Sequence, residues 1–469
     1  MSVMDSFIGA LLDERDGEQF DLHDAHLNRQ LVRVLRTIGF DRHYVSAKGP
    51  YLYDSDGHEY LDLLSGFGVF ALGRNHPTVN AALIDVLQRD LPNLVQLDVS
   101  LLSGLLGDAM VKIAPSDRLN RVFFANSGAE TVEAAMKFAR YSTGRSRIVF
   151  CHEGYHGLTY GALSVTADKG FRAGFGPFLG HCDAIPFNDL AALEEALAAD
   201  DVAAFIVEPI QGKGVNIPAE DYLREAERLC RARGTLFVAD EVQTGLGRTG
   251  KMWAVEHYGA QPDMLLCAKA LSGGQTAVGA VLATASVFDA VFDRMDRAVV
   301  HGSTFSKNNL GMAAGLATLK VLEEERLAEH AADMGAQLVS AMRPFIEKYE
   351  FVKDVRGKGL MVGIEFGKPS SIGLRTAWTL LEKANVSLFS QMILIPLLSD
   401  HRILAQVSSH GRHVIKLLPP LVISDRDVKW TVGAFDKTIG DCHQVTGAIW
   451  DLGRRLATHA LAQPRAAKG

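Results

Sequence analysis

Two short stretches set the architecture of this chain: Leu236-Phe-Val-Ala-Asp-Glu-Val-Gln-Thr-Gly245 and Cys267-Ala-Lys-Ala270. In each, a short apolar run ends at a charged side chain, Asp240 in the first and Lys269 in the second. Such runs are typical of strands that are buried on both faces of a parallel sheet. Because ligands of open α/β sheets bind outside the carboxyl ends of the strands, we expect Asp240 and Lys269 at one ligand site.

An aspartate and a lysine at such a site suit the chemistry of pyridoxal 5′-phosphate (PLP). A carboxylate keeps the pyridine nitrogen of this cofactor protonated, and a lysine amine forms a Schiff base with its aldehyde. Burial lowers the pKa of an amine and so favours its neutral, nucleophilic form. The plain alternative is a surface lysine. The apolar run before Lys269 and its small neighbours Ala268 and Ala270 disfavour this alternative.

The composition is that of an ordinary globular enzyme. The chain has 469 residues, enough for two or three domains, and 48% of them are hydrophobic. The formal net charge of -7 disfavours nucleic-acid binding, which needs a basic surface. No apolar run has the roughly 20 residues that span a bilayer, and no secretory signal is present. We therefore expect a cytoplasmic protein without a membrane or nucleic-acid partner.

The cysteines give no sign of disulfides or of a metal site. The five of them are scattered and odd in number, which is typical of reduced thiols in a cytosolic protein. Neither Cys151-His152 nor His181-Cys182 has a second pair of ligands at the spacing of a zinc site, so no metal is predicted.

The order of segments predicts an α/β fold with two parts. From Val122 to about Leu282 apolar strands alternate with helical segments, which indicates βαβ units and a mostly parallel sheet. A long helical segment, Leu310 to about Lys348, leads away from this region, and Met1 to Asp24 is expected to be poorly ordered. We expect a large domain over residues 61–315 and a smaller α+β domain over residues 316–469, joined by residues 1–60.

An anion site is predicted after the first strand of the alternating region. Asn126-Ser-Gly-Ala-Glu130 precedes a helical run, and a helix N-terminus offers free backbone N–H groups and here also a hydroxyl to a phosphate. The alternative is a plain helix cap in which Ser127 and Glu130 form a capping box. A second pattern, Gly245-Leu-Gly-Arg-Thr-Gly250, matches a dinucleotide fingerprint, but the acidic residue that should end the next strand is replaced by Lys269.

Taken together, the motifs resemble the class III aminotransferases, PLP enzymes of fold type I. The resemblance runs from about Gly49 to Ile449. The motifs that carry it are Asn126-Ser-Gly-Ala-Glu, Tyr155-His-Gly, Glu208-Pro-Ile-Gln-Gly, Asp240-Glu-Val-Gln-Thr-Gly, Ala268-Lys-Ala and Gly302-Ser-Thr-Phe. The resemblance implies a seven-stranded, mostly parallel sheet and a homodimer with active sites at the interface.

The resemblance also implies a role for each motif residue. Lys269 carries the cofactor and moves the proton, Asp240 pairs with the pyridine nitrogen, and Tyr155 stacks on the ring. His156 and Glu208 join the cofactor-binding residues through their motifs. The remaining contacts are Val242 below the ring, Gln243 at the ring hydroxyl, Ser127, Gly128 and Ala129 at the phosphate, and Thr304 at the phosphate of the partner subunit.

Three positions depart from relatives that act on amino acids. Leu158 stands where an arginine grips a carboxylate, and Lys213 and Lys416 stand where a glutamate and an arginine form a switchable bridge. Two lysines cannot form that bridge, and lysine lacks the bidentate fork of arginine. We therefore expect neither ornithine nor 4-aminobutyrate as substrate. Diamine (putrescine-type) aminotransferases lack this arginine, and the stretch Ser65-Gly-Phe-Gly-Val-Phe70 is similar to theirs.

The segment 387–398 is unusually long and apolar. With Lys416-Leu-Leu-Pro-Pro420 and Gly447-Ala-Ile-Trp450, it resembles aldehyde-aminating members of secondary metabolism, such as the prodigiosin pyrroline-forming type. The segment is interpreted either as an apolar wall for an alkyl chain or as a core strand with a dimer contact.

The sequence therefore predicts a PLP-dependent transaminase that acts on an amine, aldehyde or ketone without an α-carboxylate. The alternatives are a diamine or ω-amino acid transaminase that uses 2-oxoglutarate, a racemase, mutase or decarboxylase of the same fold, and a nicotinamide oxidoreductase.

Overall fold

The computed structural model describes residues 7–93, 99–384, 388–408 and 413–443. The motif Gly447-Ala-Ile-Trp450 and residue 387 of the segment 387–398 lie outside these residues. Three sheets form the frame of the described chain. Their strands are β1 (Tyr44–Lys48), β2 (Tyr51–Asp54), β3 (Glu59–Asp62), β4 (Leu119–Ala125), β5 (Arg147–Cys151), β6 (Cys182–Ile185), β7 (Val202–Val207), β8 (Leu236–Asp240), β9 (Met264–Cys267), β10 (Gly279–Thr284), β11 (Val352–Lys358), β12 (Met361–Phe366), β13 (Ile403–Leu404), β14 (Gln406–Val407) and β15 (Val414–Leu417).

Eighteen α-helices and three short 3₁₀ helices are described. The α-helices are α1 (Phe7–Glu14), α2 (Gln19–His26), α3 (Arg29–Ile38), α4 (Ser65–Gly68), α5 (Pro77–Gln88), α6 (Leu101–Lys112), α7 (Gly128–Thr143), α8 (Tyr160–Ser164), α9 (Lys169–Arg172), α10 (Leu190–Leu197), α11 (Tyr222–Ala232), α12 (Ala285–Val291), α13 (Asn309–Glu324), α14 (Leu327–Met342), α15 (Phe345–Lys348), α16 (Ile372–Ala384), α17 (Leu388–Ser399) and α18 (Asp425–Asp441). The 3₁₀ helices are η1 (Ala254–His257), η2 (Lys269–Ser272) and η3 (Met295–Arg297).

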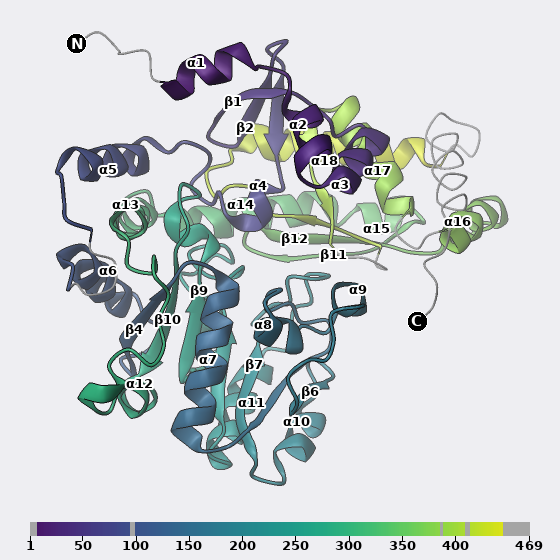
Figure 1. The fold of residues 1–469 in the computed structure, drawn as a ribbon. Helices are drawn as coiled ribbons and strands as arrows, with labels where there is room; N and C mark the ends of the chain where they lie inside the picture. Colours follow the sequence, from purple (N-terminus) through teal and green to yellow (C-terminus); the bar gives the residue numbers. More distant parts are fainter. Residues whose placement is uncertain (1–6, 94–98, 385–387, 409–412, 444–469) are drawn as a thin grey trace.

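The largest sheet has seven strands in the order β4-β10-β9-β8-β7-β5-β6. All its pairs are parallel except those that β10 makes with β4 and β9. Figure 1 shows this sheet in the lower half of the molecule, with α7 across it. The fold is therefore α/β with a mostly parallel seven-stranded sheet, as predicted from the alternation of strands and helices.

The central strands are apolar throughout because helices cover both faces of the sheet. On one face, alternate residues such as Ile206 and Val238 pack with α7 and α12. On the other, their neighbours Val207 and Phe237 pack with α6, α11 and α13. Charged residues are thus excluded until each strand ends, and Asp240 and Lys269 follow the apolar runs at the carboxyl edge.

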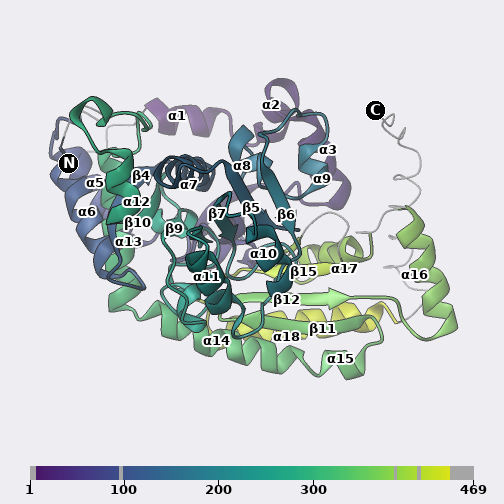
Figure 2. The same ribbon diagram turned by 90° about the horizontal axis from the view of Figure 1, so that it is seen from below.

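The two smaller sheets draw on both ends of the described chain. One has the order β1-β2-β3-β13, and its parallel pair β3–β13 joins Leu61 to Ile403 across most of the sequence. The other has the order β11-β12-β15-β14 and is covered by α14, α17 and α18 (Figure 2). This arrangement supports the predicted domains 61–315 and 316–469 with an N-terminal segment that joins the second, a division that remains a proposal.

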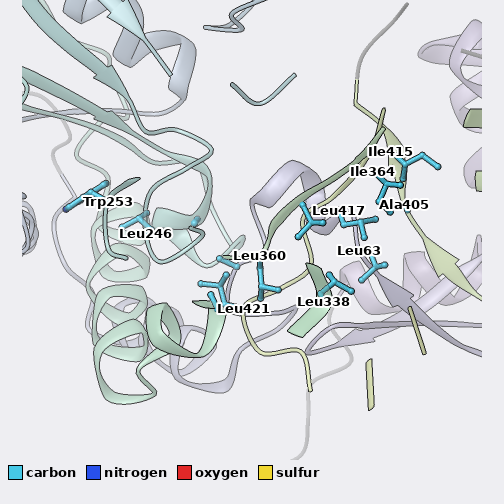
Figure 3. Packing of buried hydrophobic residues seen from close by; sticks show 14 of the residues in the cluster. Leu63, Leu246, Trp253, Leu338, Leu360, Ile364, Ala405, Ile415, Leu417 and Leu421 are labelled. Atoms are coloured by element: carbon cyan, nitrogen blue, oxygen red, sulfur yellow. The ribbon is translucent and has the colours of Figure 1, made fainter. Parts of the chain in front are cut away.

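An apolar core continues from the large sheet into the small one (Figure 3). It runs from Trp253 and Leu246, which follow β8, through Leu360 and Leu421 to Ile364 on β12. The fully buried Arg248 crosses the same boundary and donates to the carbonyl oxygens of Leu360 and Pro419. The two parts are thus held together by both apolar packing and backbone hydrogen bonds.

Two sequence-based expectations about helices were wrong. The segment Leu310 to Lys348 is three helices, not one, because Arg326 adopts a left-handed φ of 50° between α13 and α14. Within residues 1–24, the described part from Phe7 onward forms α1 and most of α2 rather than an irregular tail. In the described chain, no helix combines the length and apolar character that crossing a membrane requires.

Candidate active site

A cavity of about 810 Å³ opens at the carboxyl ends of β7, β8 and β9. Its wall comes from the large sheet on one side and from α17, β14 and β15 on the other. Every residue predicted for cofactor binding lines it except Thr304. The lining predicted residues are Ser127, Gly128, Ala129, Tyr155, His156, Glu208, Asp240, Val242, Gln243 and Lys269.

Lys269 opens η2 directly after β9, with a φ of 40° that a lysine adopts rarely. Its amine has no hydrogen-bond or ion-pair partner among the described residues. Burial lowers the pKa of this amine, against the opposing pull of Asp240 and Glu208. A strained backbone position that delivers an unpartnered, easily deprotonated amine into a cavity suits a nucleophile.

Asp240 ends β8 and is held by a fully buried histidine. Its Oδ2 lies 2.7 Å from Nδ1 of His156, and its Oδ1 accepts the backbone N–H of Val242 at 3.1 Å. Burial alone would lower the pKa of His156, but the hydrogen bond and charge of Asp240 raise it. Each carboxylate oxygen keeps further acceptor capacity, so Asp240 can still receive an N–H from the cavity.

Glu208 ties together the two loops that flank the cavity. Its Oε1 accepts the backbone N–H of Tyr155 at 2.9 Å, and its Oε2 accepts that of Gly212 at 2.8 Å. Burial raises the pKa of this carboxyl, and the nearby His156 works in the opposite direction. The predicted cofactor-binding residue Glu208 thus lines the cavity, while both its oxygens hold the backbone around it.

The N-terminus of α7 points its first turn at the cavity. Ser127 caps this 16-residue helix by accepting the N–H of Glu130 at 3.2 Å. The carboxylate of Glu130 reaches back to the N–H of Asn126 at 2.6 Å, one residue before the position that a capping box requires. The cap and the anion site are therefore compatible, since Gly128 and Ala129 still face the cavity.

The walls for a flat ring come from Val242 and Tyr155. Val242 lies against Gly128 and also borders the cavity. Tyr155 is half-buried, and its ring meets Phe171 edge to face at 5.8 Å between centroids. The cation of Lys213 lies 5.4 Å from the centre of the Tyr155 ring. An apolar side chain and an aromatic ring at one cavity suit an aromatic ligand between them.

Gln243 connects the cavity to an unusual left-handed turn. Its Nε2 donates to the backbone oxygen of Phe67 at 3.2 Å, while its Oε1 accepts from Nζ of Lys416 at 3.0 Å. The four residues Ser65 to Gly68 all have positive φ. This turn puts the side chain of Phe67 at the cavity with 55% of its surface exposed.

The lysines at the two departures from the family pattern have different partners. Lys213 forms an ion pair with Asp168 at 2.6 Å. Nζ of Lys416 donates to the carbonyl oxygen of Gly212 at 2.8 Å and to Gln243. Burial, reinforced by the charge of Lys269, lowers the pKa of Lys416 to about 7. Leu158, at the third departure, lines the cavity.

The described part of the apolar segment is the helix α17, so its interpretation as a strand was wrong. Phe389, Met392 and Ile393 pack into the core, and Gln391 is the residue of this helix that lines the cavity. An apolar wall for an alkyl chain is therefore not what α17 provides. The run is apolar almost throughout, so neither a helical nor a strand period is visible in its sequence.

The Gly245–Gly250 loop packs on the smaller part of the molecule rather than around a phosphate. A β-carbon on Gly247 would approach Leu421, and one on Gly250 would come within 2.9 Å of Ala332. No helix follows this loop directly, as a dinucleotide fingerprint requires. Its glycines are explained by close packing, which disfavours the nicotinamide alternative.

Sequence reasoning missed Asp168, Phe171, Gln391 and Gln406. Phe171, Gln391 and Gln406 line the cavity, and Asp168 neutralises Lys213 beside it. None belongs to a motif: Asp168 precedes α9, Phe171 lies on α9, Gln391 on α17 and Gln406 on β14, which pairs with β15. Each is an ordinary residue type in its surroundings, so the sequence gives no specific signal for these four positions.

The described residues fit PLP. The set combines a nucleophilic amine, a buried carboxylate for a ring nitrogen, a helix N-terminus for a phosphate, and two walls for a ring. The fold and this donor set define a PLP-dependent enzyme of fold type I. A family model described as aminotransferase class-III matches residues 38–439. The chain belongs to the class III aminotransferase family, and its cofactor is pyridoxal phosphate.

Several known proteins are similar to most of the chain. Aminotransferase PigE of a Serratia species is 34% identical over 464 residues, which cover 92% of this chain; the match spans about half (54%) of that relative. Putrescine aminotransferase of Pectobacterium atrosepticum is 42% identical over 348 residues, 72% of this chain and 73% of the relative. Ornithine aminotransferase of Toxoplasma gondii, in a crystal structure with PLP at partial occupancy, superposes with a TM-score of 0.79 at 30% identity, covering 94% of this chain and 99% of that one.

Proposed function

We propose that the protein transfers an amino group between an amine or carbonyl compound that lacks an α-carboxylate and an oxo-acid partner. PLP, when bound, supplies an electrophilic aldehyde and a ring that withdraws electrons from the carbon that bears the amine. The Nζ atom of Lys269 takes the proton from that carbon and would pass it to the aldehyde carbon of the cofactor, a general acid–base step worth about 10²–10⁴ in rate. Asp240, oriented by His156, holds the proton on the ring nitrogen.

The observation that carries the substrate class is the surroundings of Leu158. This apolar side chain borders the cavity, as do the aromatic rings of Tyr155 and Phe171. The cation on that side, Lys213, is already paired with Asp168. A distal carboxylate, such as that of 4-aminobutyrate, would find no unpaired cation there among the described residues. An alkyl or aminoalkyl chain would pack on the same wall.

A diamine donor is the second candidate. The putrescine aminotransferase of Pectobacterium atrosepticum is 42% identical to this chain. A diamine, like the alkylamines of the proposed class, carries its reacting amine on a carbon without a carboxylate. The amide groups of Gln391 and Gln406 at the cavity are neutral acceptors for a distal ammonium.

We further propose a homodimer in which Thr304 completes the partner's phosphate site. Thr304 is exposed and lies outside the cavity of its own chain. Large apolar side chains are exposed nearby in sequence, among them Met295, Val299 and Phe305, and Leu101 is exposed on α6. Such exposed apolar surface supports burial against a second copy. The five cysteines form no disulfide among the described residues, which suits a reducing compartment such as the cytoplasm.

The test is to mix the PLP-loaded protein with one amine at a time, without an acceptor, and to follow loss of the cofactor's long-wavelength absorbance. Alkylamines and diamines should react quickly, while ornithine and 4-aminobutyrate react slowly. Leu158→Arg is the matched variant and should gain 4-aminobutyrate. Fast reaction of the unchanged protein with 4-aminobutyrate would overturn the substrate class. No reaction with any amine would overturn the aminotransferase activity.

A further inference from the structure

Lys416 is a buried lysine that faces the substrate cavity without a carboxylate partner in the described chain. Only 5% of its surface is exposed, and it borders the same cavity as Lys269. Buried lysines are rare unless they are paired, because the charged form loses its hydration. The side chain must therefore be either neutral or matched by a charge that enters the cavity.

The hydrogen bonds of Lys416 satisfy a neutral amine. They would leave one N–H of the protonated amine without an acceptor. Nζ donates to two acceptors, the carbonyl oxygen of Gly212 at 2.8 Å and Oε1 of Gln243 at 3.0 Å. A neutral amine has two N–H groups, which these acceptors satisfy. An ammonium group has three. The third N–H has no partner among the described residues and is left to whatever occupies the cavity.

A second donor lies beside Lys416 on the same face of the small sheet. Gln406 on β14 is the register partner of Lys416 on β15, so the two side chains point to the same side. Both border the cavity, and Nε2 of Gln406 is buried without a hydrogen-bond partner. A buried amide N–H next to an amine that can gain a proton is suited to two oxygens of one carboxylate.

The surroundings of Lys416 keep the pKa of its amine near neutral pH. Lys269 on η2 and Lys213 disfavour its charged form, while Glu208 at the end of β7 favours it. The neighbouring position on β12 is Gly363, and that on β14 is Gln406, so neither strand adds a charge beside it. The pKa of about 7 means that a bound anion can shift the amine to its protonated form at little cost.

We propose that Lys416 is a proton-coupled switch for the two substrates, neutral while a cationic amine occupies the cavity and protonated when it receives the carboxylate of the oxo-acid acceptor. This inference deepens the proposed function and rests on it. It explains how one cavity without the arginine–glutamate bridge serves substrates of opposite charge. The neutral amine does not repel a diamine, and the ammonium, with Gln406, pairs with an anion.

Glutarate is the probe, because it carries the carboxylates of a five-carbon oxo acid but has no carbonyl to react. Calorimetric titration into the PLP-loaded protein, in two buffers of different ionisation enthalpy, measures both its affinity and the number of protons taken up. Above about pH 7, we expect binding to take up close to one proton and to weaken by up to about tenfold per pH unit.

Variants separate the switch from general loss of folding. Lys416→Met should lose glutarate affinity by at least about tenfold, as expected for removal of a buried charge partner. Lys416→Arg should bind glutarate without proton uptake, because a guanidinium stays protonated. Lys320→Met is the control and should stay within about threefold of the unchanged protein, since this exposed lysine on α13 pairs with Glu324 and lies outside the cavity. The cofactor absorbance of each variant checks that the site is intact.

Three outcomes would overturn the switch: no glutarate binding by the unchanged protein, binding without proton uptake, or Lys416→Met that binds as tightly as the unchanged protein. Each is distinct from failure of the proposed function, which is seen in the reaction with amines alone. A protein that reacts with alkylamines but fails these measurements would retain its proposed activity and lose only the switch.

Discussion

Gly128 and Val242 are packed so closely that a β-carbon on residue 128 would lie 2.8 Å from Cγ1 of Val242. This contact joins the first turn of α7 to the residue that follows β8 by two positions. It therefore couples the predicted phosphate end of the PLP site to the predicted floor under the ring.

Gly128→Ala should weaken PLP binding by about tenfold or more, because overpacking of this kind costs about 1–3 kcal/mol. Titration of the apoprotein with PLP, followed by absorbance, measures the effect. Gly433→Ala on α18 is the matched control, since nothing lies within 4 Å of its new β-carbon. The control should bind PLP normally and be slightly more stable. Equal PLP affinity in both variants would contradict the coupling.

The ion pair of His156 and Asp240 should make folding stability depend on pH. The pKa of His156 is raised in the folded protein, so its stabilising contribution is complete below its unfolded value of 6.5 and is lost as pH rises through the folded pKa. His156→Gln removes this titration. The difference in unfolding free energy between the two proteins should therefore shrink as pH rises above 6.5. A difference that stays constant or grows would show that His156 is neutral in the native state.

Glu208→Gln should loosen both loops that the carboxylate now holds. One oxygen becomes an NH₂ group, which cannot accept from the N–H of Tyr155 or of Gly212. We expect a loss of about 1–3 kcal/mol in unfolding free energy, as for other unsatisfied buried donors. Chemical denaturation measures it, and hydrogen exchange at Tyr155 and Gly212 locates it. Unchanged exchange at both residues would argue against the bridging role.

The proposed sharing of Thr304 across a dimer predicts complementation. Lys269→Ala and Thr304→Glu should each be inactive, the first for lack of the nucleophile and the second because a carboxylate repels the phosphate. After joint refolding, a mixed dimer holds one site with Lys269 from one chain and Thr304 from the other. Random pairing restores about a quarter of the normal activity. No recovery despite mixed dimers, seen by native mass spectrometry, would place Thr304 in its own chain's site.

The sequence predicted the parts of this structure that depend on local chemistry. Buried parallel strands must be apolar, so β7, β8 and β9 and the carboxyl-edge positions of Asp240 and Lys269 could be located in advance. The partners of these residues could not. That Asp240 meets His156, that Asp168 pairs with Lys213, and that α17 is a helix all depend on how distant segments pack, and nothing in the local pattern specifies that packing.

The left-handed turn at Ser65 to Gly68 presents the side chain of Phe67 at the cavity. The bond from Gln243 ends on the backbone oxygen of residue 67, so its geometry does not depend on which side chain that residue carries. The side chain of Phe67 is 55% exposed and lines the cavity. Substitutions of residue 67 can therefore reshape this wall of the cavity for new amines while the catalytic residues stay unchanged. Residue 67 is thus a starting point for the divergence, or the laboratory evolution, of substrate range.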